Sequence, residues 1–245
     1  MHEEKVGRLH PVSVALRDIA DIFARMGFGI AYGPELEDEF HNFDGLRMFS
    51  DHPARDMQDT FWIKDRPGYV LRTHTTSVTI RELEKMAKSG ETEKRMINPG
   101  KMFRNEATDV THEAQFYQLD GFAVGFDITL AHLKGTFARF YQEYLGKNAR
   151  VRFRPSYFPF TEPSVEVDAW FEPAGKEGRW LEMCGAGMLH PDVIKNAGLD
   201  PRKVQGFAFG GGLERLIMVK YNIPDIRLFH SGDVRFVYGF SSEPL

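Results

Sequence analysis

Two long amphipathic helices are predicted by apolar residues that recur at intervals of three and four along the chain. The first stripe lies between Pro11 and Gly27 and consists of Val12, Leu16, Ile19, Phe23 and Met26. The second runs from about 129 to 145, ends at Gly146 and consists of Leu130, Leu133, Phe137, Phe140 and Tyr144. Proline in the first turn and glycine just beyond the last are common helix boundaries. We expect both stripes to pack against a core.

The stretch 96–125 predicts a strand, a long loop and a second strand. Side chains of a strand point alternately to its two faces, so Arg104 and Glu106 share one face of the first arm. On the returning arm, one face carries an aromatic ring, an amide and a carboxylate, namely Phe116, Gln118 and Asp120. A solvated face of an ordinary hairpin is the simpler interpretation. The connection 107–115 is longer than the usual hairpin loop of about 2 to 5 residues, which favours a functional site.

The remaining pattern indicates an α+β domain. Strands are predicted at 28–32, 70–73 and 151–160, a helix at 78–87, and a strand in GFAFGGG that leads into a helix, LERLIMVKYNI. Residues 35–70 are poorly periodic and read as an ordered loop over a site. Many strand signals interrupted by long helices predict an antiparallel sheet flanked by helices. No linker or repeat is visible, so we expect residues 1–245 to form a single domain.

Composition excludes several classes of protein. The 245-residue chain has 42% hydrophobic residues, a net charge of −4 and one cysteine, Cys184. A single cysteine excludes an internal disulfide and a multi-cysteine zinc site. The charge is not that of a strongly basic nucleic-acid binder. No stretch approaches the about 18 apolar residues of a membrane span, and a charged start is unlike a signal peptide, so we expect a cytoplasmic protein without membrane contact.

Common nucleotide and hydrolase motifs are absent from the sequence. The run from Gly210, Gly-Gly-Gly-Leu-Glu-Arg, fails G-x-G-x-x-G at its last position, and no G-K-[ST] follows it. G-x-S-x-G and H-E-x-x-H are absent too. A sheet with convergent polar groups remains as the candidate site.

Six segments, in order, resemble the alpha subunit of phenylalanyl-tRNA synthetase, a class II aminoacyl-tRNA synthetase. They are DHPARDMQDTFW, LRTHTTSVTIR, FRNEATDVTHEAQFYQLDG, RFRPSYFPFTEPS, WLEMCGAGMLHP and GFAFGGGLERL. The resemblance covers nearly the whole chain and implies the class II catalytic fold. It implies activation of L-phenylalanine by ATP with Mg²⁺, followed by transfer to tRNA(Phe).

The resemblance also assigns roles to residues that would bind ATP. Arg104 is similar to the motif 2 arginine at the α-phosphate and Arg215 to the motif 3 arginine at the γ-phosphate, which makes these two the catalytic candidates. Glu182 is the candidate for Mg²⁺, because a hard cation prefers carboxylate oxygens. The other implied ATP contacts are Glu106, His112 and Phe116, with the ring of Phe116 stacking on the adenine.

Eight positions match the family's amino acid site. The ammonium and carboxylate are expected near His74, Thr76, Gln118 and Asp120, and the side-chain pocket is expected to contain Phe158, Phe160, Ala186 and Ala208. From the residues alone, two same-side phenylalanines such as Phe158 and Phe160 are more often core than pocket. The chain departs from the family at three positions: the family often has glutamate at Asp120 and serine at Thr76, and a bulkier residue at Gly211.

The resemblance implies a beta subunit in a heterotetramer, with the helix 12–26 and the strand before Pro34 at a subunit interface. The helical arm that usually precedes this domain and an anticodon-binding domain are expected to be absent. Two alternatives stay open: a paralogue that activates an amino acid for an acceptor other than tRNA, and a non-catalytic binding protein of the same fold. Retention of Arg104, Glu106, Glu182 and Arg215 together argues against the binding protein.

Overall fold

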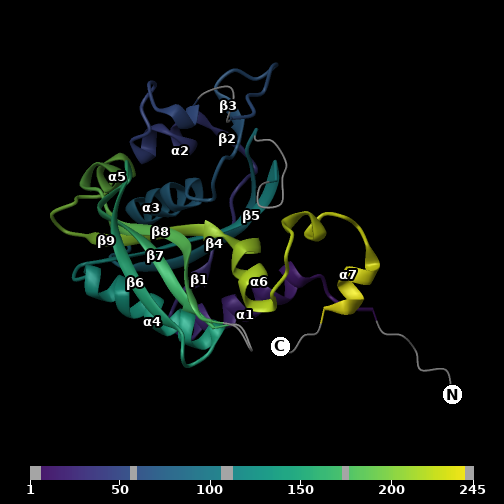
Figure 1. Ribbon diagram of the computed structural model, residues 1–245. Helices are drawn as coiled ribbons and strands as arrows, with labels where there is room; N and C mark the ends of the chain where they lie inside the picture. The colour runs from purple at the N-terminus through teal and green to yellow at the C-terminus, as the bar shows by residue number, and fades with distance from the viewer. Residues whose placement is uncertain (1–6, 56–59, 106–112, 173–176, 241–245) are drawn as a thin grey trace.

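A seven-stranded sheet organises the molecule. Figure 1 shows the computed structural model with helices on both sides of this sheet. Residues 7–55, 60–105, 113–172 and 177–240 are described. The strand order is β1-β4-β5-β9-β8-β7-β6. The strands are β1 (Gly29–Ile30), β4 (Lys94–Phe103), β5 (Gln115–Gly125), β6 (Arg150–Phe158), β7 (Thr161–Phe171), β8 (Arg179–Leu189) and β9 (Gln205–Gly212). All neighbouring pairs are antiparallel except β1 and β4, which are parallel. The α+β prediction is confirmed, with a mixed rather than purely antiparallel sheet.

Helices cover both faces of the sheet (Figure 1). Side chains of α1 (Pro11–Ala24), α4 (Leu130–Leu145) and α6 (Leu213–Tyr221) share one apolar cluster with residues of the sheet. Side chains of α3 (Ser77–Ser89), α5 (Pro191–Asn196) and the 3-10 helix η1 (Asp44–Leu46) form a second cluster. Strand β5 contributes Leu119 and Ala123 to the first cluster, and Phe122 and Val124 to the second. The even-numbered residues of β5 therefore face the α3 side.

The two predicted long helices are confirmed, and their ends have the expected chemistry. Pro11 occupies the first turn of α1, and the His10 side chain accepts a hydrogen bond from the backbone N–H of Val12. Thr129 caps α4 in a capping box with His132. The predicted helix 78–87 corresponds to α3, which ends at Gly90 with a φ of 75°, a conformation that glycine adopts readily.

Residues 35–70 contain more structure than the sequence pattern predicted. They hold β2 (Leu36–Asp38), α2 (Glu39–Asn42), η1, η2 (Pro53–Arg55) and the start of β3 (Tyr69–Leu71), which pairs with β2. These elements are too short to show a period in the sequence. Of them, α2 and η1 pack on α3. The strand predicted at 28–32 is shorter in the structure and consists of β1 alone. At the other end of the chain, η3 (Ile226–Phe229) and α7 (Val234–Gly239) follow α6.

Among the described residues, no helix is both long and apolar enough to cross a membrane.

Candidate active site

Four strands bring the expected phosphate-binding residues to one end of the sheet. The end of β4 pairs with the start of β5, Phe103 with Gln115, and the start of β5 pairs with the end of β9, Gln118 with Gly212. The end of β9 in turn lies beside β8 through the pair Gly210 and Gly185. Segments far apart in the sequence therefore converge here: Arg104 follows β4, Phe116 begins β5, Arg215 follows β9 and Glu182 begins β8.

A cavity of about 470 Å³ opens beside these residues on the α3 face of the sheet. Its lining includes polar groups at one side and aromatic rings at the other. The lining residues are Met48, His52, Thr73, His74, Thr76, Arg104, Gln118, Tyr157, Phe158, Pro159, Phe160, Gly185, Ala208, Phe209 and Gly210. Six of the expected amino acid contacts are thus brought together, although the sequence separates them by more than 100 positions.

Asp120 lies beneath the polar side of this cavity. It is 0% exposed, and the Thr76 hydroxyl donates a hydrogen bond to its Oδ2. Burial raises the pKa of Asp120 to about 7, against the opposing effect of the Thr76 and Thr75 hydroxyls and of the Arg104 and Arg72 charges. A buried carboxylate that resists ionisation gains from a cationic partner, and a substrate ammonium is such a partner.

His74 presents a neutral imidazole to the cavity. Burial, together with the Arg104 charge, lowers its pKa to about 3. Its Nε2 lies 2.9 Å from the carbonyl oxygen of Asn42. A carbonyl can only accept a hydrogen bond, so Nε2 carries the proton and Nδ1 carries a lone pair. That Nδ1 is buried and has no hydrogen-bond partner among the described residues.

Aromatic rings form the apolar side. Phe158 and Phe160 stack with ring centroids 5.9 Å apart and an interplanar angle of 16°. Gly185 makes room for them, since a Cβ at that position would lie 2.6 Å from the tip of the Phe158 ring. Ala208 lines the same cavity from β9.

The structure does not bring Ala186 to the cavity. On β8 it pairs with Phe209, and it packs into the apolar cluster on the opposite face of the sheet. Its neighbours Gly185 and Gly187 face the cavity side instead, because side chains alternate along a strand. The expectation that Ala186 belongs to the side-chain pocket is therefore corrected: Gly185, and not Ala186, lines the cavity.

Arg104 and Phe116 form one half of the expected ATP site. The Arg104 Nε donates to the Thr73 carbonyl oxygen at 3.3 Å, and its guanidinium carbon lies 5.5 Å from the centroid of the Phe116 ring. Two of the residues expected to bind ATP, Glu106 and His112, lie outside the described residues.

Arg215 and Glu182 form the other half. The Arg215 Nε donates to the Glu182 carbonyl oxygen at 2.7 Å, which ties the start of α6 to β8. In the pairing of β7 and β8 the register shifts so that Met183 is an extra residue, and Glu182 then pairs with Asp168. The bulge returns the Glu182 side chain to the cavity face. Its carboxylate accepts a hydrogen bond from Arg154 Nη2 at 3.2 Å and is largely exposed.

Glu214 is a buried residue of this region that the sequence did not single out. Its Oε1 accepts a hydrogen bond from the Tyr117 backbone N–H at 2.7 Å, so it connects the first turn of α6 to β5. Burial raises its pKa to about 7. Cavity-lining residues of the 35–70 region, Met48 and His52, were missed as well, since nothing periodic marks them. Gly210 could have been predicted from the sequence, because it lies two residues after Ala208 on the same strand and therefore faces the same side.

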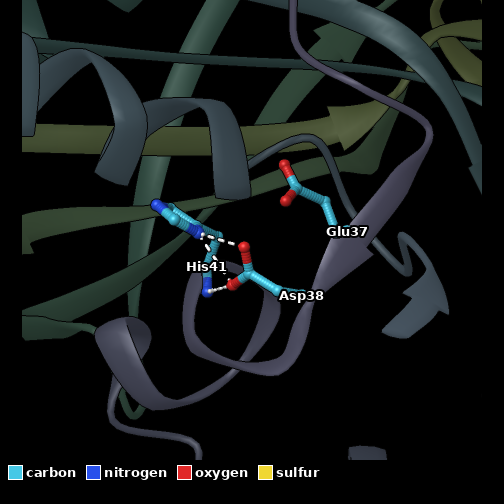
Figure 2. Close-up of side chains that lie close together, drawn as sticks. All are labelled: Glu37, Asp38 and His41. Atoms are coloured by element: carbon cyan, nitrogen blue, oxygen red, sulfur yellow. Dashed lines mark hydrogen bonds and ion pairs between the residues drawn. The ribbon is translucent and has the colours of Figure 1, made fainter. Parts of the chain in front are cut away.

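A cluster of three potential metal ligands lies behind the cavity, at the start of α2. Glu37, Asp38 and His41 are the only such group of three among the described residues, with ligand atoms within 4.8 Å of one another (Figure 2). Arg81 already occupies both Glu37 oxygens, with Nε at 2.9 Å and Nη2 at 2.5 Å. We therefore interpret the cluster as an ion-pair network.

Comparison with known proteins agrees with this geometry. The family described as tRNA synthetases class II core domain (F) matches residues 1–240. A protein of Syntrophomonas wolfei is 47% identical over 241 residues, which cover 96% of this chain and 69% of that protein. A protein of Cytophaga hutchinsonii is 46% identical over 243 residues, covering 96% and 70%, and one of Bacillus pumilus is 44% identical over 246 residues, covering 98% and 70%. Each of the three is named phenylalanine–tRNA ligase alpha subunit. The chain therefore belongs to the class II tRNA synthetase core family and, within it, to the phenylalanine–tRNA ligase alpha subunits.

Proposed function

We propose that this protein activates L-phenylalanine with ATP and transfers the phenylalanyl group to tRNA(Phe), as a catalytic alpha subunit. One observation carries the proposal: a single cavity joins an apolar recess at Phe158, Phe160 and Ala208 to the neutral imidazole of His74 and to Thr76, whose hydroxyl binds the buried Asp120. Arg104 stands at the polar side of the same cavity. An amino acid with a phenyl side chain matches this distribution of apolar and polar groups.

The residues support activation without a general base. The carboxylate of an amino acid is ionised at neutral pH, so its attack on the α-phosphate of ATP requires alignment and charge neutralisation rather than proton removal. We assign Arg104 to the α-phosphate and Arg215, in the first turn of α6, to the γ-phosphate. Phe116 offers a ring for the adenine. Arginine suits both places because its planar guanidinium donates two parallel hydrogen bonds to phosphate oxygens.

The exposed carboxylate of Glu182 fits Mg²⁺. Mg²⁺ is usually held by one or two carboxylates together with substrate phosphates, and it neutralises the charge on those phosphates when bound. Arg154 holds the Glu182 side chain at 3.2 Å, so the carboxylate is oriented before any ligand enters.

Selection of the amino acid follows from the rest of the cavity. The ammonium would lie near Asp120 and the Nδ1 of His74, within reach of Gln118. The phenyl ring would lie beside Phe158 and Phe160, with Ala208 at the end of the recess. The side chain of Asp120 is one methylene shorter than that of the usual glutamate. The hydrogen bond from the Thr76 hydroxyl fixes the position of its carboxyl group.

Assembly with a beta subunit in a heterotetramer, and action in the cytoplasm, belong to the same proposal. The apolar stripe of α1 is packed within the chain's own core. The edge strand β1 and the residues after it instead expose apolar surface, with Ile30 42% and Tyr32 73% exposed. We assign this edge to the subunit interface, because unpaired edge strands with exposed apolar side chains favour association.

ATP–pyrophosphate exchange with each amino acid in turn tests the activity. Wild type, prepared with its second subunit, should exchange with phenylalanine and charge tRNA(Phe). Arg104→Ala should lose about 100-fold or more in kcat, the usual effect of removing a donor that acts in the transition state. Arg202→Ala removes an arginine whose one ion-pair partner in the described part of the chain is the nearby Asp200, and this variant should exchange normally.

Three outcomes would contradict the assignment. Absence of exchange with every amino acid would favour a binding protein. Exchange without tRNA charging would favour a paralogue with another acceptor. A folded Arg104→Ala protein that exchanges at the wild-type rate would remove Arg104 from the site.

A further inference from the structure

Asn42, the last residue of α2, is fully buried behind the cavity wall. Its side chain makes two hydrogen bonds to one residue: Nδ2 donates to the Thr73 Oγ1 at 3.1 Å, and Oδ1 accepts from the Thr73 backbone N–H at 3.3 Å. Its own carbonyl oxygen accepts from His74 Nε2 at 2.9 Å. One residue thus holds both the backbone and an imidazole of the segment that lines the polar side of the cavity.

The bond to the Asn42 carbonyl determines which His74 nitrogen can accept a hydrogen bond. It keeps the proton on Nε2 and leaves the buried Nδ1 as a hydrogen-bond acceptor with no partner in the described part of the chain. A buried acceptor without a partner destabilises the folded protein, because burial has removed its hydrogen bonds to water. A ligand that donates a hydrogen bond to Nδ1 would replace those lost bonds. The ammonium of an amino acid is such a donor.

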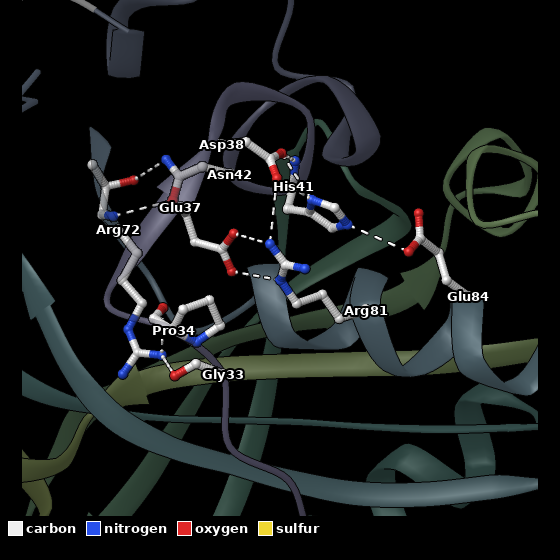
Figure 3. Close-up of polar contacts among 10 residues, drawn as sticks. Gly33, Pro34, Glu37, Asp38, His41, Asn42, Arg72, Arg81 and Glu84 are labelled. Atoms are coloured by element: carbon white, nitrogen blue, oxygen red, sulfur yellow. Dashed lines mark hydrogen bonds and ion pairs between the residues drawn. The ribbon is translucent and has the colours of Figure 1, made fainter. Parts of the chain in front are cut away.

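Helix α2 is itself fixed to α3. Arg81 on α3 binds both oxygens of Glu37, just before α2, and His41 lies 2.8 Å from Asp38 and 3.4 Å from Glu84 (Figure 3). Glu37 is buried and the other groups are partly exposed. Asn42 therefore belongs to a short helix that is anchored to α3 by these contacts.

We propose that Asn42 is a positioning residue for the amino acid site: it holds Thr73 and His74 so that the His74 Nδ1 accepts a hydrogen bond from the substrate ammonium. The inference rests on the proposed function for the identity of the substrate. Asn42 does not line the cavity itself, so it acts through His74.

Equilibrium binding of two ligands, without ATP, separates positioning from a general loss of structure. L-Phenylalanine carries the ammonium, while 3-phenylpropanoate has the same ring and carboxylate without it. Asn42→Ala should weaken phenylalanine binding by about tenfold, the usual effect of losing a hydrogen bond to a charged group. Binding of 3-phenylpropanoate should change by less than about twofold, because it makes no contact that depends on the His74 Nδ1.

Four further proteins complete the design. Asn196→Ala is the matched control, because its amide donates to the Gly45 carbonyl in the same layer but does not contact the 72–76 segment. Thr73→Val removes only the hydroxyl that accepts the hydrogen bond from Asn42 Nδ2. It should weaken the binding of phenylalanine, and not that of 3-phenylpropanoate, by about threefold. This variant replaces Asn42→Ala as the test if Asn42→Ala does not fold. In His74→Ala, adding Asn42→Ala should weaken phenylalanine binding no further.

Equal weakening of both ligands, or additive effects in the double variant, would overturn the proposal. The His74 tautomer gives a readout that does not depend on the substrate: nitrogen NMR should show the proton on Nε2 in wild type and both tautomers in Asn42→Ala. A wild type that binds no phenylalanine but shows the Nε2–H tautomer would refute the proposed function and leave the positioning by Asn42 standing. Both tautomers in the wild type would refute the positioning itself.

Discussion

Replacing Asp120 by asparagine should change how the stability of the protein depends on pH. The carboxylate is 0% exposed, and burial raises its pKa from 3.8 to about 7. Below pH 3.8 the Asp120 side chain is protonated in both the folded and the unfolded protein. Between pH 3.8 and about 7 the unfolded chain loses the proton while the folded protein keeps it. The free energy of unfolding therefore falls as pH rises, and this loss is complete just above pH 7.

The size of the effect follows from the two pKa values. Their difference corresponds to about 4 kcal/mol, of which about 3 kcal/mol falls between pH 5 and pH 8. Asparagine has nearly the same shape and does not titrate, so Asp120→Asn lacks this decrease. Its amide N–H₂ group adds a penalty of about 1 to 3 kcal/mol if left without a partner, and that penalty is independent of pH.

Urea unfolding of wild type and Asp120→Asn at a series of pH values measures the difference. Glu214, whose pKa is also raised to about 7 by burial, titrates in both proteins and cancels in the comparison. We expect the stability of Asp120→Asn relative to wild type to increase by about 3 kcal/mol from pH 5 to pH 8. A difference that stays constant over this range would show that Asp120 ionises normally, and the argument from its burial would fail.

Three further changes test the cavity and the edge of the sheet. Gly210→Ala should abolish phenylalanine binding and lower the melting temperature, because the new Cβ would lie 2.2 Å from the Asp120 Oδ1; a variant with normal affinity would refute this geometry. Ala208→Gly should let para-chlorophenylalanine compete in pyrophosphate exchange, with a gain of about 10- to 200-fold relative to phenylalanine, and an unchanged ratio would remove Ala208 from the recess. Replacing Ile30 and Tyr32 by glutamate should weaken association with the second subunit in sedimentation experiments while the thermal melt of the isolated chain stays within a few degrees; unchanged association would place the interface elsewhere.

Local patterns determined the elements that are long or marked by special residues. The apolar stripe after Pro11 predicted α1, and the alternation of Gln118 and Asp120 placed both on one face of β5, because a period of 3.6 or 2 is a property of a single segment. The motif residues Arg104 and Arg215 were also identified from sequence, through resemblance to a family. Their convergence at one end of the sheet required the strand pairing, which joins positions far apart in the chain.

Only the tertiary structure decided the details on which the site depends. Ala186 and Gly185 are neighbours in the sequence, yet their faces are set by the register of β8 with β9, and Glu182 reaches the cavity side only through the bulge at Met183. Asn42 belongs to a four-residue helix, too short for any period, and its contacts are with residues about 30 positions away. The shifted pKa values of His74 and Asp120 likewise result from burial. Burial cannot be predicted from the sequence pattern here, because desolvation depends on which residues pack around a group in space.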